Sequence, residues 1–267
     1  GHWMPNLYGA TVKSDISDYA KLWGPKYSPD ELKIYPTSII ANTELYDRFK
    51  QGKYRPYSYD ELLSVLQNTN PQTPRYARLT RVIRDFPSTD IVEGNKFTNF
   101  RQIAEKEILA KVKKLQDIRS REVKLLEIAF DQLKLETIQY NTSVSTEYFI
   151  SYKTKNNLKN IEGDKIAAFL RLSLPKKILS KNNFIEELQN CAIIREVHVY
   201  GKTVGIGKKD TGRAQHLGLG TKLTELACVI SKKNKFKKLA VISAIGTREY
   251  YRKRKFFDKG LYLVRDI

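Results

Sequence analysis

Two hydrophobic patterns divide the chain. In residues 1–90, short apolar runs typical of strands alternate with stretches whose apolar residues recur every three or four positions, as on a helix. The strand-like runs are 4–8, 32–35 and 75–85, and the helical stretches are 14–22, 43–50 and 58–67. Strands that alternate with helices build parallel sheets, so this part predicts α/β structure. It is too short for a complete α/β barrel, which needs roughly 200 residues or more.

Two of these helices have recognisable starts. Ser14 precedes the first apolar-periodic stretch and is a good N-cap. Ser58 and Glu61 stand three positions apart, as in a capping box. We therefore expect helices to begin at these serines.

From residue 88 the pattern changes. Residues 88–98 are polar and predict a linker, and 99–115 predict an amphipathic helix. Strand-like runs, two helices and two more strands follow: 122–130, 133–140, 147–153, 165–174, 193–200, helix 217–231, 239–245, helix 247–254 and 261–264. Antiparallel strands followed by a strand–helix–strand–helix–strand order indicate an α+β domain. The fold prediction is mixed α/β (α+β), divided into 1–90, a linker-helix region 91–116, and 117–267.

Charge and cysteine content narrow the function. The 267 residues carry 48 Lys+Arg against 29 Asp+Glu, a net charge of +19, with 41% apolar residues for a core. Such an excess favours a polyanionic partner, most often nucleic acid, although a general lysine bias is the alternative. Two cysteines, Cys191 and Cys228, cannot build a four-cysteine zinc or a three-cysteine iron–sulfur site. We expect no metal, no disulfide framework, no membrane span and a reducing, cytoplasmic compartment.

A glycine loop carries the clearest chemistry. Gln215, Gly218 and Gly220 form a Q-x-x-G-x-G pattern between the strand 193–200 and the helix 217–231. Glycines at a helix start let a ligand approach free backbone N–H groups, with the helix dipole behind them. This arrangement is typical of a pyrophosphate site.

The residues flanking this loop are candidates for catalysis. Alternation places Glu196, His198 and Tyr200 on one face of the strand, with Val197 and Val199 on the other. Glu196 is either a general base or a strand-face partner of Arg195 or a lysine. Tyr250 and Tyr251 follow the strand 239–245. A phenol stays protonated at neutral pH and can act as a general acid, whereas packing is the alternative for each ring.

The strand, the glycine loop and the helix resemble the core of the GCN5-related N-acetyltransferase family. More specifically, REVHVYG (195–201), QHLGLG (215–220), AVIS (240–243) and GTREYYRK (246–253) resemble the acetyltransferase domain of the catalytic subunits of Elongator. Further matches to that family are HWMP (2–5), LKIYPT (32–37), RVIRDFP (81–87) and DIRSREV (117–123). The resemblance covers nearly the whole chain in order. It implies an acetyltransferase domain preceded by the last part of a radical-SAM barrel.

The resemblance also implies a function. That family modifies the wobble uridine of tRNA at carbon five, using acetyl-CoA and a radical-SAM domain. By resemblance, the cofactor residues are Glu196, Val197, His198, Val199, Gln215, Gly218, Leu219, Gly220, Thr221 and Tyr251. Tyr251, with Tyr250 beside it, would protonate the CoA thiolate, and Glu196 would assist the attack. The expected partners are the anticodon region of tRNA and other Elongator-like subunits; a protein lysine acetyltransferase or a non-catalytic tRNA-binding module are the alternatives.

Departures from the family limit this expectation. The iron–sulfur cysteine motif and the upstream barrel are absent, so this chain alone cannot generate a radical. Gln116 and Ala129-Phe130 stand where zinc-type residues are expected, and Lys255 replaces a usual glycine.

A set of arginines is the candidate tRNA surface: Arg75, Arg78, Arg81, Arg84, Arg101, Arg119 and Arg121. Arginines bind phosphates, and Tyr54, Tyr57 or Tyr76 could stack on unpaired bases. The alternative is that these arginines pair with Asp85 and with glutamates inside the fold.

Overall fold

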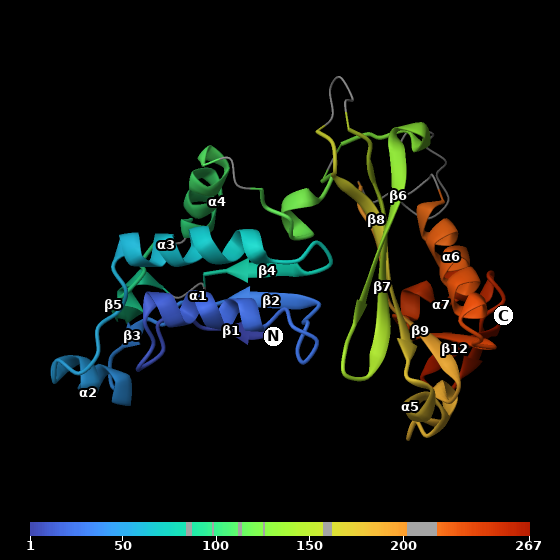
Figure 1. Ribbon diagram of the computed structural model, residues 1–267, viewed down its shortest axis with the longest axis horizontal. Helices are drawn as coiled ribbons and strands as arrows, with labels where there is room; N and C mark the ends of the chain where they lie inside the picture. Colours follow the sequence, from blue (N-terminus) through green and yellow to red (C-terminus); the bar gives the residue numbers. More distant parts are fainter. Residues whose placement is uncertain (84–86, 98, 112–113, 125, 157–161, 202–217) are drawn as a thin grey trace. The chain divides into compact units, whose positions relative to one another are not determined.

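A computed structural model describes residues 1–267 except 84–86, 98, 112–113, 125, 157–161 and 202–217 (Figure 1). The chain forms two compact units, Gly1–Arg121 and Glu122–Ile267. Each unit is described by itself. The mixed α/β prediction is confirmed.

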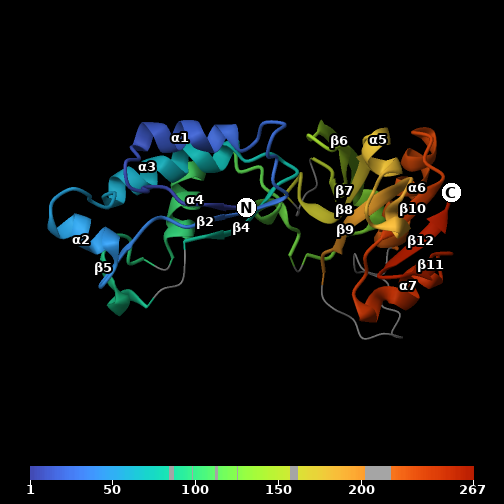
Figure 2. The ribbon, with the colours of Figure 1, turned by 90° about the horizontal axis from the view of Figure 1, so that it is seen from below.

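The first unit is built on a parallel sheet of order β1-β2-β4. Its strands are β1 (His2–Trp3), β2 (Glu31–Ile34) and β4 (Arg78–Val82), and its main helices are α1 (Val12–Lys21), α3 (Tyr59–Thr69) and α4 (Phe100–Ala110). The parallel pairing confirms the α/β prediction for this part of the chain. Figure 2 shows α1 and α3 side by side over the sheet, and α3 also contacts α4. Tyr19, Ile34, Leu66 and Phe100 are fully buried in the common core.

The helix starts follow local hydrogen bonds. Ser58 caps α3: its Oγ accepts from the Glu61 amide at 3.2 Å, and Glu61 Oε2 accepts from the Ser58 amide at 2.9 Å. The predicted capping box is confirmed. The predicted cap at Ser14 is wrong, because Thr11 caps α1 and Ser14 is the reciprocal partner three residues later. The helix therefore begins earlier than expected.

Two other expectations for the first unit are wrong. Residues 4–8 form no strand; the chain turns at Asn6 (φ 65°), whose amide donates to Asp15 at 2.7 Å. The polar stretch 88–98 contains β5 (Ile91–Glu93), which pairs with β3 (Ile39–Ile40) near α2 (Glu44–Lys50). Because α4 buries Phe100 and Ala104 in the same core, the segment expected to link two domains packs into the first unit.

The second unit has a seven-stranded sheet of order β11-β12-β10-β9-β8-β7-β6. The strands are β6 (Leu133–Asn141), β7 (Ser145–Thr154), β8 (Ile166–Pro175), β9 (Cys191–Val199), β10 (Lys238–Val241), β11 (Phe257–Lys259) and β12 (Tyr262–Asp266). Strands β9 and β10 pair in parallel, the other neighbouring strands of this sheet pair antiparallel, and α6 (Leu219–Lys233) lies between β9 and β10 in sequence. The predicted order of antiparallel strands followed by strand–helix–strand is confirmed.

Helix α6 covers the centre of this sheet. It packs against β8 and β9 and buries Leu219, Leu223 and Ala227. Two short helices, α5 (Lys177–Lys181) and α7 (Arg248–Arg252), follow β8 and β10. The strand predicted at 122–130 is wrong: Glu122 makes a single bridge to Ile166, and Lys124 has φ 53°. An extended ladder cannot continue through such a left-handed residue.

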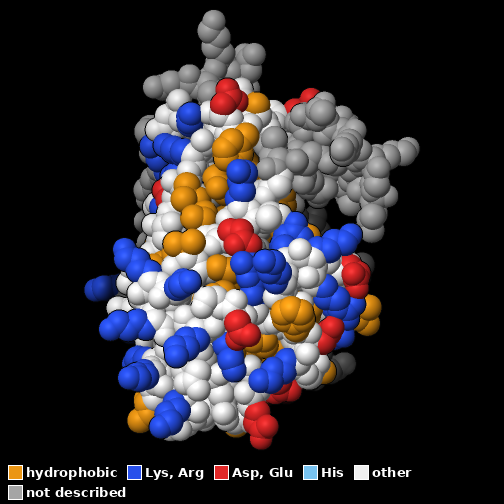
Figure 3. Space-filling model, turned by 90° about the vertical axis from the view of Figure 1, so that its right-hand side faces the viewer, with side chains coloured by type: hydrophobic (Ala, Val, Ile, Leu, Met, Phe, Trp, Pro, Cys, Tyr) orange, Lys and Arg blue, Asp and Glu red, His pale blue; other side chains and the backbone are white. Residues whose placement is uncertain are grey.

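The high positive charge is visible on the surface. Figure 3 shows Lys and Arg side chains outnumbering carboxylates over one face of the protein. None of the helices among the described residues is long and apolar enough to cross a membrane.

Candidate functional site

Strands β9 and β10 part in the middle of the second unit. They pair from Cys191 to Ile194, but β9 continues to Val199. Against β8, Ile194 lies opposite Leu172 and Glu196 opposite Arg171, so Arg195 is an extra residue in a β-bulge. Among the described residues, no strand pairs with the β10 side of 195–199. In the part of the chain that the structure describes, the backbone groups on this side of 195–199 are therefore available to pair with an extended ligand.

The N-terminus of α6 lies at the same end of the sheet. Gly218 is the N-cap in the left-handed conformation (φ 63°), and it makes no side-chain cap hydrogen bond. Gln215 lies outside the described residues. The amides of the first turn have no partner within a helix, and the helix dipole adds positive potential there. This end of α6 can accept an anionic group.

Tyr250 of α7 faces this helix start. A Cβ on Gly220 would lie 2.8 Å from the Tyr250 hydroxyl and 3.6 Å from Val199. The Tyr250 hydroxyl is buried and has no hydrogen-bond partner within the described parts of the chain. A buried hydroxyl without a partner is costly and invites an explanation such as a ligand.

Arg254 and Thr221 hold Tyr250 in place. The Arg254 guanidinium lies 3.5 Å from the centre of the Tyr250 ring and donates to the Tyr250 carbonyl at 2.5 Å. Its Nε also donates to Thr221 Oγ1 on α6 at 3.1 Å. These contacts tie α7 to the first turn of α6.

Tyr251 occupies a different environment. It is 7% exposed and packs edge-on against Tyr250 and Phe256, with ring centres 5.1 and 5.5 Å apart. Burial raises the pKa of Tyr251 to about 12. Its phenol is therefore protonated throughout the neutral range.

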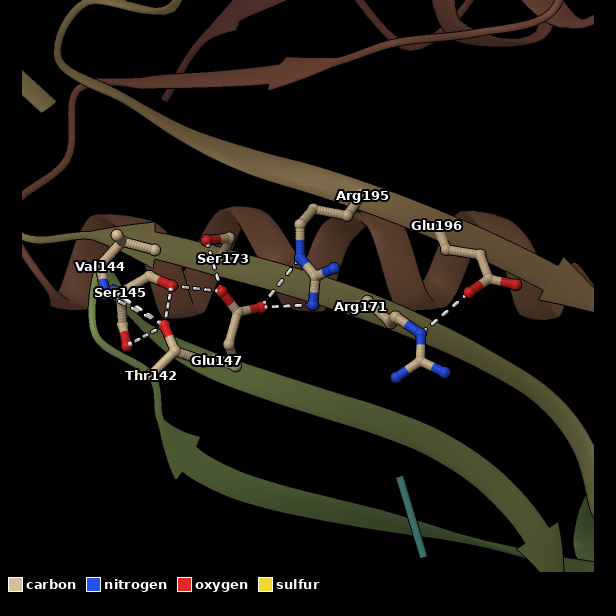
Figure 4. Close-up of polar contacts among 8 residues, drawn as sticks. All are labelled: Thr142, Val144, Ser145, Glu147, Arg171, Ser173, Arg195 and Glu196. Atoms are coloured by element: carbon tan, nitrogen blue, oxygen red, sulfur yellow. Dashed lines mark hydrogen bonds and ion pairs between the residues drawn. The ribbon is translucent and has the colours of Figure 1, made fainter. Parts of the chain in front are cut away.

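Glu196 forms an ion pair across the sheet. Its Oε2 accepts from Arg171 Nε on β8 at 2.9 Å (Figure 4). Arg171 is 2% exposed, and its guanidinium lies 5.3 Å from the Phe149 ring and 5.5 Å from the Phe169 ring. The sequence predicts Arg195 or a lysine as the ion-pair partner of Glu196, and this is wrong: the partner is Arg171. Arg171 was not among the predicted site residues. Its signal in the sequence is a single charge inside the apolar strand run 165–174, which indicates a buried residue that needs a partner.

Arg195 points to a second carboxylate. Its Nη2 and Nε donate to Glu147 Oε2 at 2.7 and 3.0 Å, while Ser145 and Ser173 donate to Glu147 Oε1 at 2.5 and 2.6 Å. Figure 4 shows these donors converging on Glu147 from β7, β8 and β9. Glu147 is 4% exposed. The carboxylate thus anchors the bulge residue to two neighbouring strands.

The remaining β9 residues follow the predicted alternation. His198 pairs opposite Phe169 and stacks on it at 5.7 Å, and its ring centre lies 4.4 Å from that of Tyr200. Val197 and Val199 lie opposite Leu170 and Ala168, on the other face. His198 is exposed, whereas Tyr200 is buried.

Some of the candidate arginines meet in the first unit. Arg81, Arg101 and Arg119 line one cavity of about 630 Å³ together with Lys33 and Tyr35. Arg75, Arg78 and Arg121 are not among the residues that line it. Arg84 and Asp85 lie outside the described residues.

Three of the candidate arginines also have structural contacts. Arg121 is 4% exposed and donates to the carbonyls of Gln116 and Arg75 at 2.8 and 2.6 Å. Arg101 donates to the Leu79 carbonyl at 2.9 Å and to Glu105 at 2.6 Å. Arg119 donates to the Thr80 carbonyl. Arg101 and Arg119 therefore both brace the first unit and line its cavity, whereas Arg121 braces the unit without lining the cavity.

The three candidate stacking tyrosines serve the fold. Tyr54 and Tyr76 are 8% and 6% exposed, so burial leaves neither ring open to a base. The Tyr57 hydroxyl donates to Asp15 at 2.7 Å. Tyr35 lines the basic cavity, so it is a better candidate than these three tyrosines for stacking on an unpaired base.

Within the described residues, no group of three or more His, Cys, Asp or Glu is placed to hold a metal ion. Cys191 and Cys228 are free and buried, and burial raises the pKa of both thiols. Buried thiols of raised pKa are poor nucleophiles.

The chain is similar to known proteins over nearly its whole length. Residues 29–110 match the Radical_SAM C-terminal domain family. Elongator complex protein 3 of Dictyostelium discoideum is 35% identical over 99% of this chain and 47% of its own length; the human protein is 34% identical over 99% and 48%. The tRNA uridine(34) acetyltransferase of Methanocaldococcus jannaschii is 34% identical over 98% and 48%.

The fold comparison agrees. The structure of archaeal Methanocaldococcus infernus Elp3 with an N-terminal deletion (1–46) superposes with a TM-score of 0.87 at 31% identity, covering 100% of this chain and 62% of that one. The chain spans about half the length of the curated relatives it matches. It is a homologue of Elongator complex protein 3 and tRNA uridine(34) acetyltransferase, similar to them from one end to the other.

Proposed function

We propose that the second unit is an acetyltransferase domain of the GCN5-related type that binds acetyl-CoA, and that the protein acts in carbon-five modification of the wobble uridine of tRNA. One observation carries the proposal: the end of β9 beyond its pairing with β10, the Gly220 turn of α6 and the Tyr250 hydroxyl meet at one place, and among the described residues that hydroxyl has no hydrogen-bond partner. The names of the relatives, among them tRNA uridine(34) acetyltransferase, support the reaction class.

The residues present fit this ligand. Backbone groups of 197–199 on the open edge can hydrogen-bond an extended pantetheine arm as an added strand. First-turn amides of α6 bind the pyrophosphate, and the missing side chain at Gly220 leaves room beside Tyr250. Val199 forms the third wall of this space. Acetyl-CoA supplies the acetyl thioester.

A tyrosine acts as the general acid. With acetyl-CoA bound, its hydroxyl would donate a proton to the departing CoA sulfur as the acetyl group passes to the attacking water or amine, and the phenolate would recover a proton from solvent. Tyr251 stays a candidate from its place in the motif. The geometry favours Tyr250, because its hydroxyl has no partner among the described residues and adjoins the α6 turn.

Glu196 has a positioning role in this scheme. Its carboxylate keeps one oxygen on Arg171, and its side chain is 32% exposed. The side chain is also the candidate acceptor for a proton from an attacking water or amine. Because Arg171 is almost fully buried between two aromatic rings, the pair also fixes the strand beside the open edge.

The proposed tRNA contact is the basic cavity of the first unit. Lys33, Arg81 and Arg119 supply positive charge for phosphates there, with Tyr35 beside them. Assembly with other subunits is proposed from the relatives' name, Elongator complex protein 3.

Turnover and binding assays test the proposal together. Acetyl-CoA hydrolysis is measured with and without tRNA for the wild type, Tyr250→Phe and Tyr251→Phe, and calorimetry follows a stable thioether analogue of acetyl-CoA. We expect turnover to fall about 100-fold in the variant that loses the acid, with analogue affinity preserved. Binding of tRNA without any analogue binding would replace the proposal with a non-catalytic module. Faster acetyl transfer to histone lysines than to tRNA would replace it with a protein acetyltransferase.

A further inference from the structure

A second cavity lies at the far end of the second unit. It encloses about 710 Å³ and is lined by the end of β8, α5 and the connection from α6 to β10. The acetyl-CoA site lies where β9 ends, whereas this cavity lies where β9 begins. Nine strand residues separate the two ends by roughly 27 Å. The cavity is therefore distinct from the site described above.

Its charge is positive. Among the described residues, five lysines line it and no aspartate or glutamate does: Lys176, Lys177, Lys235, Lys237 and Lys238. One carboxylate lies nearby, because Asp266 is opposite Lys238 on β12. Four of the lysines are exposed and Lys238 is half-buried. Like charges gathered without lining carboxylates repel each other, and a polyanion relieves this repulsion.

Helix stability does not explain the cluster. Lysines near the end of α6 interact favourably with its dipole, which accounts for Lys235. Lys176 and Lys177 come from the end of β8 and the start of α5, more than fifty residues earlier in sequence. Two separate segments therefore bring lysines to one hollow.

A buried hydroxyl also lines the cavity. Ser180 is 3% exposed, and its Oγ has no hydrogen-bond partner within the described residues. Its carbonyl accepts from the Asn190 amide at 3.0 Å, which fixes this turn of the chain. The half-buried ring of Phe236 and the Asn190 side chain complete a lining with both a stacking surface and hydrogen-bonding groups.

We propose that this cavity binds the phosphate backbone of RNA without sequence preference. The lysines act as point charges toward phosphate, Ser180 donates to a phosphate oxygen, and Phe236 stacks on an unpaired base. The site lies in the second unit, so it adds to the contact proposed for the first unit and does not depend on acetyl-CoA.

Charge-matched variants of the full chain test this site. One variant carries Lys176→Gln, Lys177→Gln and Lys237→Gln. The control carries Lys155→Gln, Lys253→Gln and Lys259→Gln, three exposed lysines of the same unit that do not line the cavity. Affinity for single-stranded poly(U) is measured between about 50 and 200 mM salt. Log K falls as log salt rises, and this slope should become less steep by about 2 in the cavity variant and by much less in the control.

Two measurements keep the test decisive. Ser180→Ala retains the charge and should weaken RNA binding about fivefold, which corresponds to about one hydrogen bond. On the wild type, RNA should protect Lys176, Lys177 and Lys237 from an acylating reagent more than Lys155 and Lys259. Equal losses in both triple variants, or equal protection of all five lysines, would overturn the proposal. Preferential binding of polyglutamate over RNA would also overturn it.

The outcome is separable from the proposed function. Calorimetry with the acetyl-CoA analogue should give the same affinity for the cavity variant and the wild type. Loss of poly(U) binding alone supports the cavity site, whereas analogue binding reports on the acetyltransferase site.

Discussion

The Cα of Gly220 faces the Tyr250 hydroxyl so closely that a Cβ there would lie 2.8 Å from the oxygen. Gly220 belongs to the first turn of α6, and Tyr250 belongs to α7. The absence of a side chain at one position therefore makes room for the hydroxyl of the other. This relationship joins the predicted phosphate turn to the predicted acid.

Gly220→Ala should destabilise the protein by about 1 to 3 kcal/mol, because the new methyl group overpacks against the hydroxyl. In a Tyr250→Phe background the nearest ring atom is Cζ, 3.7 Å from the Cβ position, so the same substitution should be nearly neutral. A double-mutant cycle by urea denaturation measures this coupling. Gly246→Ala is the control, since a Cβ there would have no heavy atom of the described residues within 4 Å apart from its chain neighbours. A coupling of zero would contradict the close approach.

Tyr251 should make stability fall at alkaline pH. Burial raises its pKa from 10.0 to about 12, so the folded protein holds this proton more tightly than the unfolded chain. The stabilisation is complete below pH 10 and is lost as pH rises toward 12, with a slope of about 1.4 kcal/mol per pH unit. Tyr251→Phe should lose less stability than the wild type between these limits.

Denaturation at a series of alkaline pH values measures this difference. Tyr19 and Tyr54, whose pKa values burial also raises, are present in both proteins and cancel in the comparison. Parallel stability curves for the two proteins would show that Tyr251 titrates normally.

Glu147→Ala should cost about 2 to 4 kcal/mol, because it leaves Arg195 and two serine hydroxyls without their acceptor. The bulge should loosen with it, so affinity for the acetyl-CoA analogue should drop about tenfold. Thermal unfolding and calorimetry report the two effects. Glu44→Ala serves as the comparison: its side chain is 81% exposed, so loss of its surface ion pair with Arg48 should leave stability nearly unchanged. Unchanged analogue affinity in folded Glu147→Ala would remove the bulge from the binding argument.

Substitutions of Arg121 and Arg81 should have different effects: the first should lower stability, and the second should weaken RNA binding. Arg121→Lys loses the planar group that reaches two carbonyls and should cost about 2 kcal/mol, with little change in tRNA affinity while the protein is folded. Arg81 is exposed at the basic cavity. Arg81→Gln should make the fall of log K for tRNA with log salt less steep by about 0.9, with stability nearly unchanged. Filter binding at several salt concentrations and urea denaturation distinguish the two. If Arg121→Lys weakened tRNA binding and Arg81→Gln did not, the basic cavity would not be the tRNA contact.

Several features were predictable because their signals are local. The Ser58–Glu61 capping box needs only two residues three positions apart, and the alternation along β9 follows from strand geometry. Gly220 in the glycine pattern predicts that another group comes close to the backbone there, and the Tyr250 hydroxyl does so. In contrast, the strand expected at 122–130 was wrong, since a left-handed backbone at Lys124 leaves no mark in the hydrophobic pattern.

By itself the sequence determined the order of most elements, the apolar faces, the excess of positive charge, and the presence of a glycine pattern and of two adjacent tyrosines further along the chain. Only the tertiary structure decided that Glu196 pairs with Arg171, that Arg195 pairs with Glu147, and that Tyr250 faces Gly220. Periodicity reports which face of an element is buried. It does not report strand register, and a single bulge residue changes which charges meet across the sheet.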